Sequence, residues 1–465
     1  MTELAHAWTR HTPAPSLLPE KTTIRMKPRN RSTLLIKGAT VMLPSGPAET
    51  DVACHEGRIV AIGESLSAET EIDARGLHLL PGVVDSQVHF REPGMTHKET
   101  LEAGTRGAVL GGVTSVFEMP NTQPLTLRQE DLQAKIAIAE QDAWCNYAFY
   151  IGGAAANAEQ LPRLERLPGC CGVKVFMGSS FGDLLADSDN VLRSILRHGQ
   201  RRVAIHAEDE ARLRARRHIA EDAAHPRAHS LWRDEDSALL ATRRIVSLAN
   251  ETGRPLHLLH ISTAEEMAFL QHHKSRVSVE VLPQHLTLTA PQCYERLGTL
   301  AQMNPPIRDS RHQQALWKAV TNGIVDVIGS DHAPHTRDEK QRPYPDSPSG
   351  MTGTQTLLPL MLNHVNEGKL TLTRLVDLVC AGPARLFGMA GKGRISVGYD
   401  ADLTLVDLKK RQAVDDRKLA SPSGWSAFDG MMLQGWPSAT IVGGRLVMAE
   451  EEVIGSPAGQ AIQFL

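Results

Sequence analysis

Five widely separated segments of the chain each end an apolar run with a side chain that can bind a metal ion. The five side chains are His89, Lys174, His206, His260 and Asp331. Imidazole nitrogens and carboxylate oxygens are ligands that zinc accepts, and a carboxylate beside a metal can also carry a proton. One hydrophobic strand followed by one polar ligand, repeated five times, predicts an active site at the C-terminal mouth of a (β/α)8 barrel.

The first of these segments, GVVDSQVHFREPG (82–94), departs from a two-histidine metal clamp. Residues two apart on a strand point the same way, so Gln87 and His89 share one face. A neutral amide oxygen is a weak zinc ligand, so we expect this half of a metal site to be the weaker one. A lone histidine after a strand is more often structural, and the prediction of a site therefore rests on all five segments together.

Lys174 interrupts an apolar run at residues 172–176. A buried strand rarely carries an unpaired ammonium, because its desolvation is costly. One interpretation is an edge-strand lysine that reaches solvent. The other is an amine that has taken up carbon dioxide as a carbamate, an anion able to bridge two metals, and burial favours it by lowering the lysine pKa.

The remaining candidates divide into ligands, structural residues and substrate contacts. His206 and His260 each close a strand, and two neutral imidazoles on neighbouring strands suit zinc. His257 lies three residues before His260 and is predicted to be structural, as is His285. For an anionic substrate group the sequence offers the planar fork of Arg91, the amide of Asn121 and the imidazole of His335.

Composition limits the classes of partner. The chain has 465 residues, 41% of them hydrophobic, with a formal net charge of -3. Nucleic acid and membrane surfaces are unexpected partners because no extended basic block stands out, and no apolar run is long enough to span a membrane. Six scattered cysteines are typical of reduced thiols in a cytoplasmic protein. We therefore expect a cytoplasmic protein that acts on a small molecule.

Strand clusters at both ends flank a long alternating α/β middle. Residues 1–32, broken by prolines, are predicted to be a poorly ordered extension. Residues 33–83 and 391–455 are predicted to form one β-sandwich, with a (β/α)8 catalytic barrel at 84–390 between them and a C-terminal tail at 456–465. The loop at 333–353 is long enough to serve as a lid over the barrel mouth.

Several motifs resemble those of the cyclic-amide branch of the amidohydrolase superfamily, and most closely those of the dihydroorotases. The resemblance covers about residues 33–450. Its most specific pieces are HFREPG (89–94), THKET (96–100), EMPNTQP (118–124), GVKVFMGSS (172–180), HAEDE (206–210), MNPPIRD (303–309) and SDHAPHT (330–336).

This resemblance implies a zinc enzyme that reversibly closes N-carbamoyl-L-aspartate to L-dihydroorotate, a step of de novo pyrimidine synthesis. One or two zinc ions are implied, with Lys174 as a carboxylated bridging ligand and Asp331 as the catalytic base. The implied metal ligands are His89, Lys174, His206, His260 and Asp331, and the implied substrate contacts are Arg91, Asn121, Asn304, His335, Ser349 and Gly350.

Three alternatives stay open. Allantoinases and hydantoinase-like enzymes share the barrel and the bridging lysine, but Arg91 after His-Phe favours dihydroorotate. Gln87 is the one feature that favours a non-catalytic dihydroorotase-like partner of aspartate carbamoyltransferase. Such chains typically lose several ligands, whereas this one keeps five of six, so an enzyme is expected. A homo-oligomer and an association with aspartate carbamoyltransferase are both compatible with the resemblance.

Overall fold

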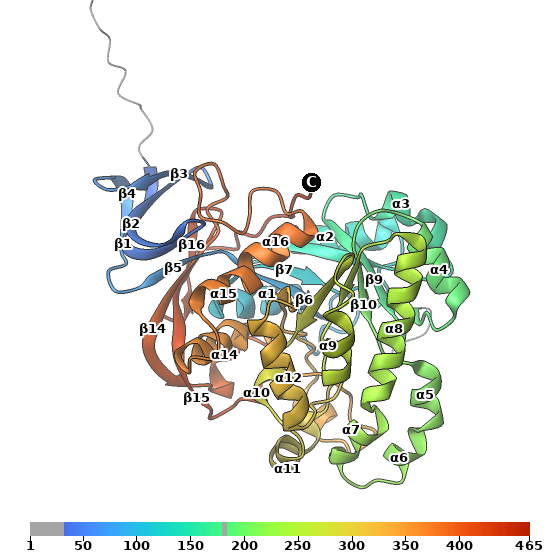
Figure 1. Cartoon of the computed structure of the whole chain (residues 1–465). Coiled ribbons are helices and arrows are strands. Elements are labelled where there is room, and N and C mark those ends of the chain that lie inside the picture. Colours follow the sequence, from blue (N-terminus) through green and yellow to red (C-terminus); the bar gives the residue numbers. More distant parts are fainter. Residues whose placement is uncertain (1–31, 179–183) are drawn as a thin grey trace, which may run out of the picture.

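The computed structural model describes residues 32–178 and 184–465, so nearly all of the predicted N-terminal extension lies outside the described residues. Figure 1 shows a strand barrel covered by helices, with a twisted sheet from the two chain ends lying beside it. The predicted fold class, a (β/α)8 barrel with a small β-sandwich domain formed by both chain ends, is confirmed, and that small domain is built on one nine-stranded sheet.

Eight parallel strands form the barrel, and they follow one another around it in chain order. They are β6 Val83–Val88, β7 Val113–Glu118, β8 Asn146–Gly152, β9 Cys170–Phe176, β10 Val203–His206, β11 Leu256–Leu258, β12 Val277–Val281 and β13 Val327–Ile328. A parallel bridge from Val88 to His332 closes the ring, and the His89 N–H donates to the His332 carbonyl at 2.7 Å. Closure thus brings the first and last predicted metal ligands, His89 and Asp331, to adjoining strand ends.

Side-chain caps begin the helices that cover the barrel. Thr100, Ser188, Asp234 and Asp309 each accept a hydrogen bond from a backbone N–H in the first turn. The helices are α1 Leu101–Leu110, α2 Gln129–Asp142, α3 Leu161–Leu164, α4 Asp189–Arg197, α5 Glu210–Ala215, α6 Arg217–Glu221, α7 His229–Trp232, α8 Glu235–Thr252, α9 Ala264–Leu270, α10 Pro283–Thr287, α11 Gln292–Leu297, α12 Ser310–Thr321, α13 Arg337–Lys340, α14 Thr354–Asn366, α15 Leu372–Val376 and α16 Gly382–Phe387.

Alternation along the strands decides which side chains face the barrel interior. Val173 and Val175 of β9 pack outward, in the large apolar core that the barrel shares with its helices. Successive strand side chains point to opposite faces, so Lys174 between them points inward. At the opposite end of the barrel the interior is filled by an apolar cluster that includes Phe117, Tyr150 and Phe387.

The two chain ends meet in one continuous nine-stranded sheet. Its strands are β1 Ser32–Leu43, β2 Gly46–His55, β3 Arg58–Gly63, β4 Ala68–Asp73, β5 His78–Pro81, β14 Leu403–Ala413, β15 Met432–Val442, β16 Arg445–Ala449 and β17 Glu452–Val453. The ends join where β5 pairs antiparallel with β14, with Leu79 opposite Leu405. A shared apolar core that includes both residues stabilises the sheet. Because β5 runs almost directly into β6, this sheet anchors the first barrel strand.

Residues 456–465, predicted as a C-terminal tail, return to the barrel. The Ile462 N–H donates to the Tyr147 carbonyl at 3.0 Å, and the Tyr147 N–H donates to the Gln460 carbonyl at 3.0 Å. Ile462 is buried in the apolar cluster at the base of the barrel. The tail therefore forms part of the folded barrel.

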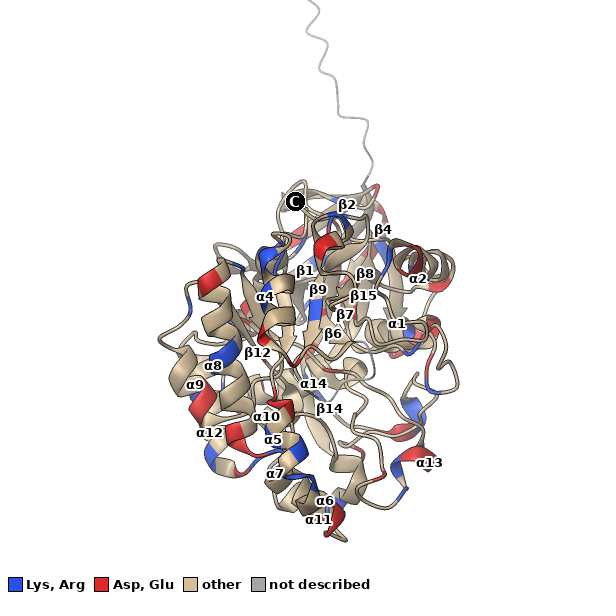
Figure 2. Ribbon diagram, turned by 90° about the vertical axis from the view of Figure 1, so that its right-hand side faces the viewer, with Lys and Arg blue, Asp and Glu red and all other residues tan. Residues whose placement is uncertain are grey.

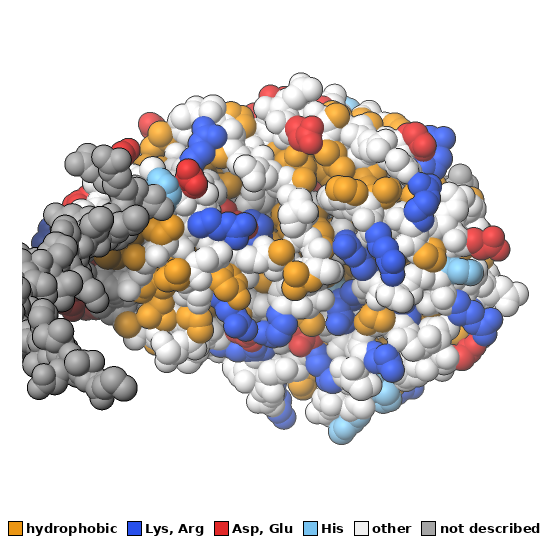
Figure 3. Space-filling model, turned by 90° about the horizontal axis from the view of Figure 1, so that it is seen from above, with side chains coloured by type: hydrophobic (Ala, Val, Ile, Leu, Met, Phe, Trp, Pro, Cys, Tyr) orange, Lys and Arg blue, Asp and Glu red, His pale blue; other side chains and the backbone are white. Residues whose placement is uncertain are grey.

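Charge is spread over the molecule in both signs. Lys and Arg alternate with Asp and Glu along the covering helices (Figure 2), and both signs are interspersed with hydrophobic side chains on the face seen in Figure 3. Within residues 32–178 and 184–465, no helix combines the length and apolar character needed to cross a bilayer. All six cysteines are buried and free.

Candidate active site

The strand ends surround one cavity of about 440 Å³ at the C-terminal mouth of the barrel. Gln87 reaches it from β6, His89 from the position directly after β6, Lys174 from β9 and His206 from β10. The cavity is lined by every residue predicted for the site: His89, Arg91, Asn121, Lys174, His206, His260, Asn304, Asp331, His335, Ser349 and Gly350. The structure thus brings all eleven together, and the role of each stays a prediction.

Three of these residues have a backbone conformation that side chains other than glycine rarely adopt. The φ angles are +62° at Arg91, +40° at His260 and +45° at Asp331. Such conformations cost about 1–3 kcal/mol each and cluster at functional sites. The barrel therefore stabilises strained turns at the positions from which these side chains enter the cavity.

His89 and Asp331 form one pair of candidate ligands. His89 Nδ1 lies 2.7 Å from Asn121 Oδ1, so Nδ1 is the nitrogen that donates and Nε2 carries the lone pair. His89 Nε2 in turn lies 3.2 Å from Asp331 Oδ1. Two electron pairs that face each other at this distance are stabilised by a cation between them. This half of the site therefore suits a metal ion.

His206 and His260 form the second pair. His206 Nε2 lies 2.7 Å from Glu208 Oε2, which places its proton there and leaves Nδ1 facing His260 Nε2 at 3.0 Å. Burial lowers the pKa of both imidazoles, so both are neutral and able to bind a metal at neutral pH. A carboxylate that holds the outer nitrogen of a ligand histidine fixes its ring orientation.

Glu208 is itself held by Arg233, which contacts both of its carboxylate oxygens. Burial alone would raise the pKa of Glu208, but Arg233 and His206 outweigh burial and hold that pKa well below its usual range. The carboxylate is therefore charged at neutral pH. Neither residue was predicted from the sequence, although Glu208 lies in the HAEDE motif only two positions after His206.

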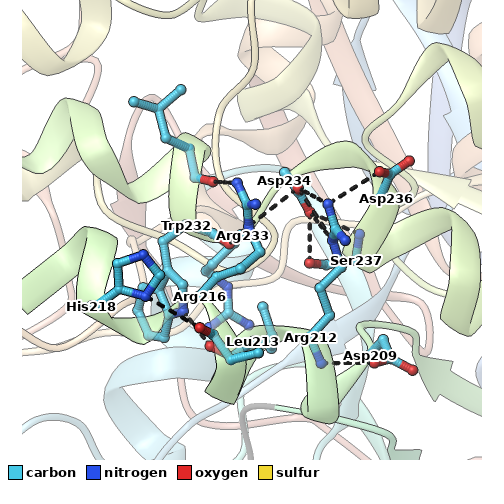
Figure 4. A network of polar contacts seen from close by, with 12 residues as sticks. Asp209, Arg212, Leu213, Arg216, His218, Trp232, Arg233, Asp234, Asp236 and Ser237 are labelled. Carbon is cyan, nitrogen blue, oxygen red and sulfur yellow. Dashed lines mark hydrogen bonds and ion pairs between the residues drawn. The ribbon is translucent and has the colours of Figure 1, made fainter.

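The turn that carries Arg233 is clamped by a neighbouring ion-pair network (Figure 4). Asp234 accepts from Arg212 Nε at 2.9 Å and from the Ser237 N–H at 3.0 Å, and it lies 3.3 Å from Arg216 Nε. Asp234 is also the N-cap of α8. Helix capping and ion pairing thus hold the backbone from which Arg233 reaches Glu208.

Lys174 is buried, and its amine interacts electrostatically with Asp331 of the first pair and with His206 and His260 of the second. Its Nζ lies 4.3 Å from the centre of the Phe176 ring and, within the described part of the chain, makes no hydrogen bond. Burial lowers the pKa of Lys174 to about 7, so a large fraction of the amine is neutral at physiological pH. A neutral amine is the form that reacts with carbon dioxide.

The donor set is consistent with a metal centre only if Lys174 takes part. Among the residues that the structure describes, His, Cys, Asp and Glu form no cluster of three suited to a metal ion. The candidates are instead two pairs, His89 with Asp331 and His206 with His260. An anionic Lys174 carbamate would complete both pairs, which matches the burial and the missing hydrogen bonds of its amine.

The opposite end of the cavity is cationic. Arg91 is buried, its Nε donates to the Pro334 carbonyl at 3.0 Å, and its Nη2 lies 3.2 Å from His335 Nε2. Burial lowers the pKa of Arg91 to about 10, which leaves the guanidinium charged at neutral pH. Because Nε is engaged with the backbone and Nη2 contacts His335, the N–H groups of Nη1 and the second N–H of Nη2 remain to bind an anion.

The segment after β13 supplies the wall beside this cationic end. The backbone at Gly350 passes close to Ala333. A Cβ at position 350 would lie 2.5 Å from the Ala333 carbonyl oxygen, so this position requires glycine. The approach brings the Ser349 carbonyl to 3.1 Å from His335 Nε2. Asn304 completes the wall, and its Oδ1 lies 2.9 Å from Nε2 of His229, a further residue that the sequence analysis did not select.

His257 and His285 have structural contacts, as predicted. His257 Nδ1 lies 2.9 Å from Ser278 Oγ and its Nε2 lies 3.3 Å from Glu280, below the cavity. His285 Nε2 donates to the Pro305 carbonyl at 3.1 Å. Both side chains are buried.

This parallel barrel, with imidazole, carboxylate and lysine side chains converging on its C-terminal mouth, defines a barrel hydrolase. The chain belongs to the amidohydrolase family, whose model matches residues 78–447. The predicted resemblance to dihydroorotases is confirmed by a dihydroorotase of Halobacterium salinarum, which is 35% identical over 400 residues and is matched over 85% of this chain and 93% of its own.

Relatives with other names are also similar. An allantoinase of Deinococcus radiodurans is 32% identical over 449 residues, which cover 92% of this chain and 98% of that protein. The solved structure of an L-hydantoinase (dihydropyrimidinase) from Arthrobacter aurescens superposes with a TM-score of 0.88 at 30% identity, over 93% of this chain and 99% of the other. These relatives act on different substrates by name, so the similarity shows the hydrolase family and does not by itself identify the substrate of this chain.

Proposed function

We propose that this protein is a zinc-dependent dihydroorotase, which interconverts L-dihydroorotate and N-carbamoyl-L-aspartate in cytoplasmic pyrimidine synthesis. The observation that carries the proposal is a cationic end of the cavity, Arg91 and His335 at 3.2 Å, in the same cavity as Asp331. Dihydroorotate has a carboxylate beside its ring amide, so it needs such a cation next to the reacting groups.

Zinc would be held by the two pairs of ligands and the carboxylated Lys174. His89, Asp331 and the carbamate would bind one ion, and His206, His260 and the same carbamate would bind the other. When bound, zinc polarises the ring carbonyl and lowers the pKa of water. We propose that the site formed by His206 and His260 is the tighter one, because Gln87 adds no imidazole to the other.

Asp331 is placed to move the proton. Its Oδ1 accepts from Gln87 Nε2 at 2.8 Å and lies 3.2 Å from His89 Nε2, whereas its Oδ2 has no hydrogen-bond partner among the described residues. In hydrolysis, water attacks the ring carbonyl carbon and Oδ2 accepts the proton of that water. The carbon–nitrogen bond then breaks and Asp331 returns the proton to the departing nitrogen. Cyclisation runs the same steps in reverse.

The other residues that line the cavity are proposed to bind the substrate. The two Nη groups of Arg91 each keep an N–H that can bind one oxygen of a carboxylate, and His335 contacts Nη2 beside them. Asn121 turns its Oδ1 to His89, so its Nδ2 is the group left to donate to substrate. Asn304, Ser349 and Gly350 form the wall against which the ring lies.

A hydantoinase-like or allantoinase-like activity is the second candidate, and the L-hydantoinase structure and the allantoinase relative favour it. The decisive experiment measures hydrolysis of L-dihydroorotate, hydantoin, 5,6-dihydrouracil and allantoin by one zinc-loaded sample. We expect the highest kcat/KM for dihydroorotate. A higher value for any substrate without the carboxylate would overturn the proposal, and absence of all turnover would favour a non-catalytic partner of aspartate carbamoyltransferase.

A further inference from the structure

Besides Arg91, a second cation lies at the carboxylate end of the cavity, and the proposed mechanism does not use it. Lys98 precedes α1, and its side chain is 12% exposed. Its Nζ lies 3.0 Å from His335 Nδ1 and 3.1 Å from Glu339 Oε1. Lys98 also lines the cavity, beside Arg91 and His335. A long cationic side chain thus reaches into the site instead of extending into solvent.

The contact with Lys98 determines which nitrogen of His335 bears the proton. A lysine ammonium has three donors and no acceptor, so Nδ1 of His335 must accept. The neutral imidazole then carries its proton on Nε2. That N–H donates to the Ser349 carbonyl at 3.1 Å. Arg91 Nη2, which is also only a donor, lies 3.2 Å from the same nitrogen and makes no hydrogen bond to it in this tautomer. The N–H of His335 and the fork of Arg91 therefore converge on one part of the cavity wall.

Glu339 stabilises the ammonium of Lys98, and its own position does not depend on that contact. Glu339 Oε2 accepts from the Thr336 N–H at 3.0 Å in the capping box of α13, so that carboxylate is already held by the backbone. The second carboxylate oxygen is the one that contacts Lys98. An ammonium with a counter-ion on one side and an imidazole on the other is oriented as a donor to His335.

We propose that Lys98 is a positioning and specificity residue for the substrate carboxylate. By donating to Nδ1 it holds His335 in the tautomer whose Nε2–H lies beside the Arg91 fork, and it adds a positive charge behind that imidazole. This inference rests on the proposed dihydroorotase activity. It predicts that Arg91 and His335 bind the anion, and that the tautomer of His335 depends on Lys98.

The test compares Lys98→Met with Lys98→Arg. The control is Lys410→Met, which also removes a lysine ion pair, here with Glu451, but in strand β14 of the nine-stranded sheet. With dihydroorotate, Lys98→Met is expected to raise KM about 10- to 100-fold, the range for a lost charge-assisted hydrogen bond, with a smaller change in kcat. Lys98→Arg should restore most of the loss, because a guanidinium is also a donor without an acceptor. Zinc content and the control should match the wild type.

A double-mutant cycle with His335→Asn separates positioning from a merely structural role. If Lys98 acts through His335, then Lys98→Met should have little further effect in the His335→Asn background. Additive losses, or an unchanged KM in Lys98→Met, would overturn the inference while leaving the proposed function intact. Absence of dihydroorotate turnover in the wild type would overturn both the proposed function and the inference about Lys98. The wild type is therefore assayed before any variant is compared.

Discussion

Gln87 donates a hydrogen bond from Nε2 to Asp331 Oδ1, at 2.8 Å, across 244 residues of sequence. The amide that replaces a second histidine on β6 therefore acts on the proposed catalytic carboxylate. Its other end gains nothing, because Gln87 Oε1 is buried and, within the described residues, has no hydrogen-bond partner. A metal ion would provide that partner, but a neutral amide oxygen would be only a weak ligand for it.

This contact predicts that Gln87→Leu lowers kcat without lowering stability. Asp331 loses a donor that orients it, and we expect kcat to fall about tenfold, the effect of one hydrogen bond of roughly 1.4 kcal/mol. Stability should be equal or higher, because a buried unsatisfied oxygen is removed as well. Steady-state kinetics and thermal unfolding check both. Gln87→His is expected to raise zinc content with activity equal or higher, and loss of turnover there would show that the amide itself is needed.

Lys174 is predicted to carry the carbamate that completes the metal centre. Lys174→Ala should lose zinc and reduce turnover at least about 100-fold, and short carboxylic acids should partly restore both by occupying the vacated space. Lys174→Arg is the matched control, since it keeps a cation but cannot form the carbamate and leaves no space for the acid. Metal analysis with and without propionate measures the outcome. Full zinc content in Lys174→Ala would contradict the carbamate.

Arg91 is predicted to bind the substrate carboxylate through its two Nη groups. Arg91→Lys keeps the charge but loses the fork, so kcat/KM for dihydroorotate should fall about 10- to 100-fold. Zinc content should not change, because Arg91 contacts Pro334 and His335 and neither is a proposed ligand. An unchanged kcat/KM would mean that another residue binds the carboxylate.

Glu208 is predicted to set metal affinity through His206. In Glu208→Gln the amide keeps the shape but weakens the 2.7 Å contact that orients the imidazole. We expect zinc affinity to fall about 10- to 100-fold, as for other partners of ligand histidines. Asp236→Asn is the control, because Asp236 belongs to the exposed edge of the neighbouring network in Figure 4. Competition with a zinc chelator measures both, and equal affinities would show that Glu208 only supports the fold.

Two buried histidines predict that acid destabilises the fold. Burial lowers the pKa of His229 to about 3 and that of His285 to about 4, against the ordinary 6.5. Below pH 6.5 the unfolded chain binds protons that the folded chain does not, so each histidine should cost about 1.4 kcal/mol per pH unit as the pH falls towards its folded value. Above pH 6.5 both histidines are neutral in the folded and the unfolded chain, so this loss of unfolding free energy is absent there.

Urea unfolding of wild type and His229→Gln at pH 7.5, 6 and 5 measures this effect. Glutamine retains an N–H donor for the Met303 and Asn304 oxygens but does not titrate in this range. The difference in unfolding free energy, wild type minus variant, should therefore shrink as the pH falls. A constant difference would show that His229 is not the group that takes up the proton.

Much of the fold and the site could be predicted from local sequence. Apolar runs that end in His89, Lys174, His206, His260 and Asp331 identify strands and their ligand ends, because parallel strands of a barrel share one mouth. The strand period of two also places Lys174 on the strand face opposite Val173 and Val175. These features depend on neighbours along the chain, so sequence alone determined them.

The partners of those side chains were decided only by tertiary structure. Lys98 meets His335 across 237 residues, Glu208 meets Arg233 across 25, and Gln87 meets Asp331 only where the last barrel strand returns to the first. Likewise the returning tail finds Tyr147 across more than 300 residues. No periodicity encodes such pairs, because hydrogen bonding depends on distances that barrel closure sets. Sequence therefore determined which chemical groups this protein brings to the mouth of the barrel, and the closed barrel decided which of them are joined by hydrogen bonds.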